Sequence, residues 1–192
     1  MKPTPTFCGV PYCADPTTLD ADVAVFGAPH GTPDVPGTPS HAANGTGAVR
    51  KSLSWFSVGR EQLDFDTGEP VFGGARVVDL GDVPGDLMDG AVNRQRIAAA
   101  ARSILDKGAV PLLLGGDDST PIPLIQAYEG RGPLTIVQVD AHIDWRNERD
   151  GVTHGYSSTM RRASEMPWVR HMVQIGARGP GSARMTEFND AK

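Results

Sequence analysis

The chain has 192 residues, of which 39% are hydrophobic and 21% are charged, with 18 Lys and Arg against 23 Asp and Glu. This length suits one domain that is large enough to bury a hydrophobic core. The net charge of −5 argues against binding to nucleic acid and favours a cationic ligand.

The sequence carries no signal for a membrane or for secretion. No apolar run approaches the roughly 20 residues that a membrane-spanning helix needs. The first six residues, Met-Lys-Pro-Thr-Pro-Thr, lack the apolar core of a secretory signal. Two cysteines, Cys8 and Cys13, are too few for a disulfide scaffold. We therefore expect a cytoplasmic protein with no membrane partner.

We expect an irregular segment at 1–20, rich in proline and polar residues, ahead of a single domain at 21–192. In that domain, a long loop of glycine, proline, threonine and serine spans 30–46. Short apolar runs that end at turn residues predict strands at 21–26, 76–83, 110–114, 134–139 and 169–175. Helices are predicted at 47–54, 92–107 and 122–128.

Short apolar strands that alternate with helices indicate a parallel sheet covered on both faces. Such sheets bind ligands at the carboxyl ends of their strands. Two polar clusters stand at those ends: 115–119, with the sequence Gly-Gly-Asp-Asp-Ser, and 140–144, with the sequence Asp-Ala-His-Ile-Asp. The sequence therefore predicts a site where these two clusters meet.

In the second cluster, Asp140, His142 and Asp144 recur at every second residue. An extended backbone would project all three side chains to one side. Carboxylate and imidazole ligands suit Mn²⁺, Zn²⁺, Fe²⁺ or Ni²⁺, and the excess of carboxylates favours Mn²⁺. The alternative is that these are solvated polar residues at the end of a strand.

The first cluster holds two adjacent carboxylates, Asp117 and Asp118. Adjacent carboxylates repel unless a cation or hydrogen-bond donors offset them, so either one is a candidate metal ligand. The alternative is that one of them caps the helix that follows. Further along the chain, His154 is a candidate proton carrier near a metal-bound hydroxide, or else a solvated loop histidine.

Taken in order, three segments resemble motifs of the ureohydrolases, the arginase and agmatinase family. Residues 114–119 resemble the family's Gly-Gly-Asp-His-Ser motif, 139–144 its Asp-Ala-His-x-Asp motif, and 153–155 its His-Gly motif. Flanking segments agree, so that the resemblance runs from Val23 to Arg184. It fits the agmatinase-like branch better than arginase itself.

This resemblance implies a binuclear Mn²⁺ hydrolase of linear amidines on a three-layer α/β/α fold with a mainly parallel sheet. Such an enzyme splits a small cationic guanidino substrate into urea and an amine. By position, Asp140 would bridge two ions, Asp144 and Asp118 would bind one of them, and His142 the other. His154 would carry a proton to the leaving amine.

Two departures from the family pattern change what we expect of this chain. Asp118 stands where the family has a histidine; a carboxylate still binds Mn²⁺. The later Asp-x-Asp-x-x-Asp-Pro motif of the family, which supplies further ligands, has no counterpart after His154. We therefore expect at most one bound Mn²⁺, and a fold that is incomplete on its C-terminal side.

We accordingly expect an agmatinase-like hydrolase that is inactive or impaired as this short chain. The alternative is a noncatalytic short homologue that acts as a binding or assembly subunit. In both cases an exposed sheet edge predicts a homo-oligomer. For substrate binding, the candidates are Trp145, which directly follows Asp144, and Asn44, which lies in the long loop.

Overall fold

Parallel strands form most of the sheet structure in the computed structural model, which describes residues 5–35, 37–58 and 63–192. Residues 1–4 of the predicted N-terminal segment and residue 36 of the long loop lie outside the described residues. The strands are Val23–Ala28 (β1), Leu63–Asp64 (β2), Glu69–Pro70 (β3), Val77–Asp82 (β4), Val110–Gly115 (β5), Leu134–Val139 (β6) and Val169–Ile175 (β7).

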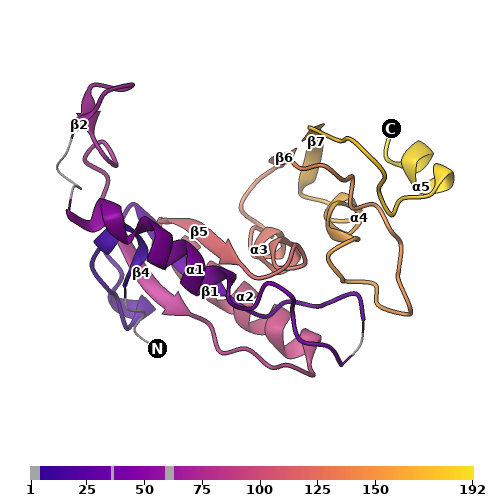
Figure 1. Ribbon diagram of the computed structural model, residues 1–192, viewed down its shortest axis with the longest axis horizontal. Coiled ribbons are helices and arrows are strands. Elements are labelled where there is room, and N and C mark those ends of the chain that lie inside the picture. Colours follow the sequence, from indigo (N-terminus) through magenta and orange to yellow (C-terminus); the bar gives the residue numbers. More distant parts are fainter. Residues whose placement is uncertain (1–4, 36, 59–62) are drawn as a thin grey trace.

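The helices lie between these strands and after the last of them (Figure 1). The α-helices are Gly45–Ser52 (α1), Gly90–Leu105 (α2), Pro121–Gln126 (α3), Thr159–Ser164 (α4) and Met185–Asp190 (α5). Short 3₁₀ helices span Phe7–Gly9 (η1), Pro16–Thr18 (η2) and Leu53–Val58 (η3). None of the helices in the described residues is both long and apolar enough to cross a membrane.

The predicted strands at 134–139 and 169–175 coincide with β6 and β7, whereas other boundaries move by one or two residues. β1 continues through Gly27 to Ala28, because its ladder with β5 extends to the pair Ala28 and Gly115. α2 begins at Gly90 because the Asp89 side chain accepts a hydrogen bond from the backbone of Val92 and caps the helix. Helices α4 and α5 lie outside the predicted elements.

The main core forms where α2 packs on the three-stranded sheet of order β4–β1–β5. The predicted apolar face of α2 is confirmed, since Ile97, Ala101 and Ile104 are fully buried. They pack with Ala24 and Phe26 of β1, the central strand, in one cluster. Burial of these side chains is the main favourable contribution to the stability of this half of the molecule.

A buried ion-pair network joins α1, β4 and the N-terminal segment. The Arg50 guanidinium donates to both oxygens of Asp79, at 2.8 and 2.9 Å, and to Asp82 at 2.5 Å. Arg50 and Asp79 are 2% and 0% exposed. Asp79 also accepts from the backbone N–H of Phe7 and of Gly81. The charges are buried, but paired and hydrogen-bonded, as burial of a charge requires.

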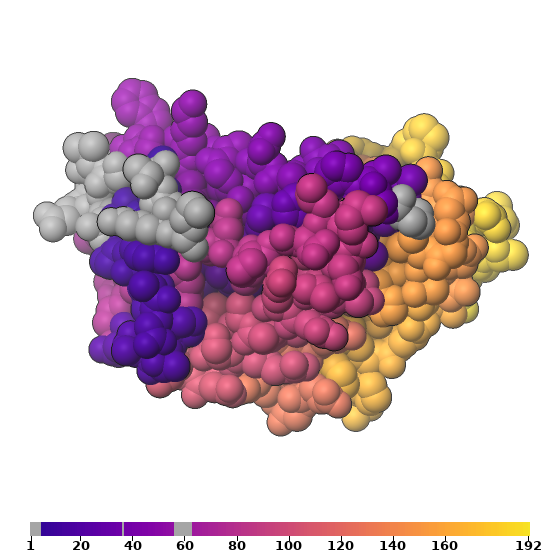
Figure 2. Space-filling model, turned by 90° about the horizontal axis from the view of Figure 1, so that it is seen from below, coloured from indigo at the N-terminus to yellow at the C-terminus, as the bar shows by residue number. Residues whose placement is uncertain are grey.

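The predicted α/β fold with parallel strands and an incomplete sheet is confirmed, and the parallel strands divide into two sheets. β6 pairs only with β7 in the described residues, so β5 and β6 are both edge strands. The N-terminal and C-terminal parts of the chain lie at opposite ends of the molecule (Figure 2). The second sheet packs on α3 and α4 through the cluster around Ile122, Ala163 and Met172.

One face of the second sheet carries exposed apolar side chains. Val137 and Val139 of β6 are 61% and 79% exposed, and Val173 and Ile175 of β7 are also exposed. An apolar face beside an unpaired edge strand is a surface that natural proteins normally cover.

We expect the loss of the Arg50 guanidinium to destabilise the fold strongly. The variant Arg50→Ala leaves two carboxylates, one of them fully buried, without their cation, which should lower the free energy of unfolding by about 3–5 kcal/mol. Urea denaturation measures this loss. The control is Arg76→Ala, which removes the solvent-exposed pairs with Asp20 and Asp22 and should cost far less. Equal losses in the two variants would contradict the assigned role of the network.

We expect the apolar face of β6 to drive self-association of this chain. The double variant Val137→Thr and Val139→Thr keeps two β-branched side chains and removes apolar surface, so it should lower the average mass measured by light scattering. Val35→Thr, at a loop position that is 45% exposed, should leave the mass unchanged. An unchanged mass in the double variant would mean that association uses another surface.

Candidate metal centre

The candidate site is formed by residues of the loops that follow β5 and β6. Asp118 follows β5 by a short turn, Asp140 directly follows β6, and Asp144 lies one turn further on. The hydroxyl of Thr159 at the start of α4 donates to the backbone oxygen of Asp118. This contact ties the loop after β5 to the part of the chain that contains the second sheet.

The carboxyl groups of Asp118 and Asp144 lie close enough to shift each other's pKa. Burial, with the nearby charges of Asp144 and Asp140, raises the pKa of Asp118 to about 8. Burial also raises the pKa of Asp144, whose oxygen accepts a hydrogen bond of 2.5 Å from the Gln138 amide. Ionisation of both carboxyl groups is therefore disfavoured at neutral pH unless a cation lies near them.

Asp140 and His142 form a local turn in place of the extended arrangement that the spacing predicted. The backbone N–H of His142 donates to Asp140 Oδ1 at 2.7 Å, and its ring Nδ1 lies 3.1 Å from the same oxygen. β6 ends at Val139, and Asp144 has a φ of 47°, so the alternation of sides is lost after the strand. His142 is half-exposed and bonded to Asp140, while Asp144 turns towards Asp118.

The two adjacent aspartates after β5 have different partners. Asp117 accepts a hydrogen bond from the backbone of Ser119 at 3.0 Å in a local turn, and it does not cap α3, whose N-cap residue is Thr120. Asp117 and Asp118 each have a buried oxygen, Oδ2, with no hydrogen-bond partner in the described residues. A buried acceptor without a donor fits a cation, and carboxylate oxygen is a ligand that Mn²⁺ accepts.

The described residues do not contain a complete ligand set. In this part of the chain, no three side chains of His, Cys, Asp or Glu are close enough to hold a metal ion together. Asp118 and Asp144 supply two carboxylates for a cation, and the charge of Asp140 acts on both of them.

His154 has charged neighbours other than these aspartates. It lines a cavity with residues of α2, and the charged groups that act on it are Arg94, Arg162 and Glu165. Burial, with Arg94 and Arg162, lowers the pKa of His154. The role of His154 as a proton carrier therefore stays a prediction.

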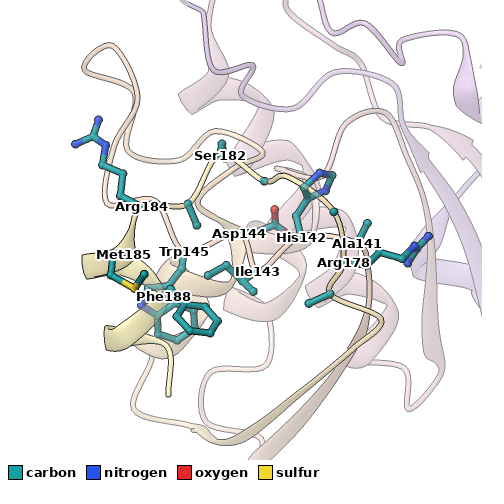
Figure 3. A pocket seen from close by; sticks show the side chains of 14 residues that line it. Ala141, His142, Ile143, Asp144, Trp145, Arg178, Ser182, Arg184, Met185 and Phe188 are labelled. Atoms are coloured by element: carbon teal, nitrogen blue, oxygen red, sulfur yellow. The ribbon is translucent and has the colours of Figure 1, made fainter.

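A pocket of about 340 Å³ adjoins Asp144 and His142 (Figure 3). Trp145 lies beside Met185 and Phe188 at one end of it, and its indole N–H donates to Asp190 of α5 at 2.9 Å. Trp145 thus packs against α5 and also lines the pocket. Asn44 is exposed and directly precedes α1. A β-carbon on the next residue, Gly45, would lie 3.1 Å from the Gly115 backbone oxygen, so the start of α1 lies close to the end of β5.

Several supporting residues were not predicted from the sequence. Gln138 holds Asp144, and Gln174 of β7 donates to the Gln138 side chain at 2.6 Å. Buried Asp34 accepts hydrogen bonds from the Ser157 backbone and hydroxyl, which joins the long loop to the loop after His154. Gln138 and Gln174 stand at matching positions of two predicted apolar strands, and this feature of the sequence could have pointed to them. No feature of the sequence pointed to Asp34.

A family model described as the arginase family matches residues 21–192. Guanidinobutyrase from Pseudomonas aeruginosa is 32% identical over 187 residues, which cover 92% of this chain and 54% of that protein. Mitochondrial agmatinase from Gallus gallus is 35% identical over 130 residues, which cover 66% of this chain and 38% of that protein.

Among solved structures, proclavaminate amidino hydrolase from Streptomyces clavuligerus superposes with a TM-score of 0.78 at 27% identity. The match covers 97% of this chain and 61% of that one. The chain spans about half the length of the curated relatives that it matches over most of its own length.

We expect the acidic pair to make the metal-free fold less stable as the pH rises. Between about pH 4 and pH 8, folded Asp118 keeps a proton that the unfolded chain releases, so the free energy of unfolding falls through this range. Asp118→Asn should reduce that fall and melt higher than the wild type at pH 8. Each kcal/mol corresponds to about 2–4 °C in a chain of this size.

Scanning calorimetry in EDTA at pH 5 and pH 8 measures this difference. Asp66→Asn, in the exposed turn between β2 and β3, is the control and should behave like the wild type. If Asp118→Asn and the wild type lose the same stability between the two pH values, Asp118 ionises freely and the acidic pair is not formed.

Proposed function

Since the chain belongs to the arginase family, we propose that it is the metal-binding part of a hydrolase that splits a guanidino compound into urea and an amine. One observation carries this proposal. Asp118 and Asp144, which follow β5 and β6, lie close enough to shift each other's pKa, and a buried carboxylate oxygen of Asp118 has no donor among the described residues. A site of this kind is suited to a divalent cation.

The metal that we propose is Mn²⁺, bound once, by Asp118 and Asp144 with Asp140 nearby. When bound, such an ion supplies Lewis acidity and lowers the pKa of a coordinated water. Gln138 orients Asp144, and Gln174 in turn orients Gln138, a second layer of hydrogen bonds of the kind that fixes metal ligands. The bond of His142 to Asp140 fixes the position of that carboxylate.

The substrate that we propose is a small guanidino compound, whose planar cation suits an acidic site. Its tail would occupy the pocket beside Asp144, where Trp145 supplies an apolar wall and Asn44 stands near the same edge of the sheet. The names of two relatives, guanidinobutyrase and agmatinase, indicate which guanidino compounds to test as substrates. We assign no step to His154, because Arg94 and Arg162 are its charged neighbours.

A second candidate, a noncatalytic binding or assembly subunit, is favoured by a different observation. β5 and β6 are unpaired edges, and the apolar face of β6 and β7 is exposed. The described residues also lack a three-residue metal cluster. Under this alternative the chain binds a partner through the open sheet and has no need of a metal.

We expect the purified chain to bind one Mn²⁺ weakly. Electron paramagnetic resonance of free Mn²⁺ during a titration counts the bound ion directly, without any requirement for turnover. Asp118→Asn and Asp144→Asn should each weaken binding by roughly tenfold or more, as loss of a charged ligand does. His171→Gln, at an exposed position of β7, is the control and should bind like the wild type.

Urea release from Mn²⁺-loaded chain, with agmatine and 4-guanidinobutyrate as substrates, then separates the two candidates. We expect release that is slow or absent in this chain. Slow release that disappears in Asp140→Ala supports the hydrolase. Absence of both Mn²⁺ binding and urea release would reject it in favour of the assembly subunit.

A further inference from the structure

A second cavity, of about 350 Å³, lies on the flank of α2 and is lined by cationic and amide side chains. Arg94 and Arg102 contribute guanidinium groups, His154 an imidazole, and Gln95 and Gln126 their amides. No carboxylate lines this cavity in the described part of the chain, although the protein as a whole is acidic. The volume is in the range of small-molecule sites.

The spacing along α2 produces this arrangement. Arg94, Ala98 and Arg102 follow one another at intervals of four residues, so they lie along one face of the helix. The small side chain of Ala98 leaves room between the two arginines. Gln126, at the end of α3, and His154, in the loop before α4, complete the lining.

Arg94 is partly buried and has no ion-pair partner in the part of the chain that the structure describes. Its guanidinium donates to the Thr32 hydroxyl at 2.8 Å. No carboxylate lies within 4.0 Å of it among the described residues. Burial lowers the pKa of Arg94, and the more distant charge of Asp89 opposes that shift only in part. A partly buried guanidinium without a carboxylate is costly unless an anion reaches it.

A third cation, Arg162, adds to the positive charge around His154. Arg162 is largely buried, and its Nε has no hydrogen-bond partner in the described residues. Its Nη2 donates to Glu165, the one acidic group that acts on His154. His154 uses Nδ1 in a 2.8 Å contact with the Thr153 hydroxyl, which leaves Nε2 for another partner. The cluster therefore has more donors than acceptors.

We propose that this cavity binds a small organic dianion, a dicarboxylate or a phosphate monoester, between Arg94, Arg102 and His154. The planar donors of a guanidinium match the paired oxygens of either group. Two negative charges offset the two arginines that line the cavity, and the glutamine amides can accept or donate at the remaining polar atoms. None of these residues is a proposed metal ligand, so anion binding does not require a bound metal ion.

Isothermal titration of the metal-free chain with succinate and with glycerol 3-phosphate tests this directly. Both titrations are made at constant ionic strength, with chloride as the balancing anion. We expect saturable binding of at least one of them at a single site. Arg94→Gln should weaken that binding about tenfold or more, because it removes a charge-assisted contact. The tighter of the two ligands identifies the chemical class.

Arg96→Gln is the matched control. It removes the same charge from the same helix, but Arg96 is exposed and donates to the Pro84 backbone oxygen, outside the cavity. It should bind like the wild type. His154→Gln, which should also weaken binding, keeps the test valid if Arg94→Gln does not fold. Histidine proton resonances supply an independent readout, since His154 should shift on saturation.

Binding that is absent in the wild type would overturn the proposal. So would equal weakening by Arg94→Gln and Arg96→Gln, because the effect would then come from overall charge. Loss of Mn²⁺ binding in Asp118→Asn, with succinate or phosphate ester binding retained, would separate this site from the proposed metal centre.

Discussion

The buried ion pairs of Arg50 fix the position of α1 and of the strand ends around it. Arg50 reaches from α1 to Asp79 and Asp82 of β4, and Asp79 also holds the backbone of Phe7. Gly27 of β1 passes so close to this network that a β-carbon there would overlap the Asp82 carboxylate. Because the network is satisfied in full only when β1, β4 and α1 are all in place, it selects one arrangement of these elements.

That arrangement determines where the metal centre can form. With β1 and β4 fixed, β5 follows along β1 and ends at the turn that contains Asp118. The second sheet has no ladder to the first in the described residues, yet Thr159 bonds to the Asp118 backbone and Asp144 reaches the Asp118 side chain. The two sheets thus meet through the acidic site at their carboxyl ends, and the uncovered apolar face of β6 and β7 lies beside it.

Charge is divided between two places in this part of the molecule. Carboxylates follow the ends of β5 and β6, whereas Arg94, Arg162 and His154 come from α2, α4 and the loop before α4. Without a counter-ion each cluster lowers the free energy of unfolding, because like charges share a partly buried space. The two clusters therefore suit ligands of opposite sign, a metal cation in one and a small anion in the other, and need not act in one reaction.

The sequence by itself determined the parallel α/β class, the apolar face of α2 and the pairing of acidic segments with strand ends, because each depends on local periodicity and strand order. Only the tertiary structure decided which side chains meet. The spacing of Asp140, His142 and Asp144 predicted side chains on one side of an extended backbone. A turn at His142 and a positive φ at Asp144 instead point these side chains in different directions. His154 likewise lies with Arg94, 60 residues away in sequence, since long-range packing and not neighbouring residues sets where a loop side chain comes to rest.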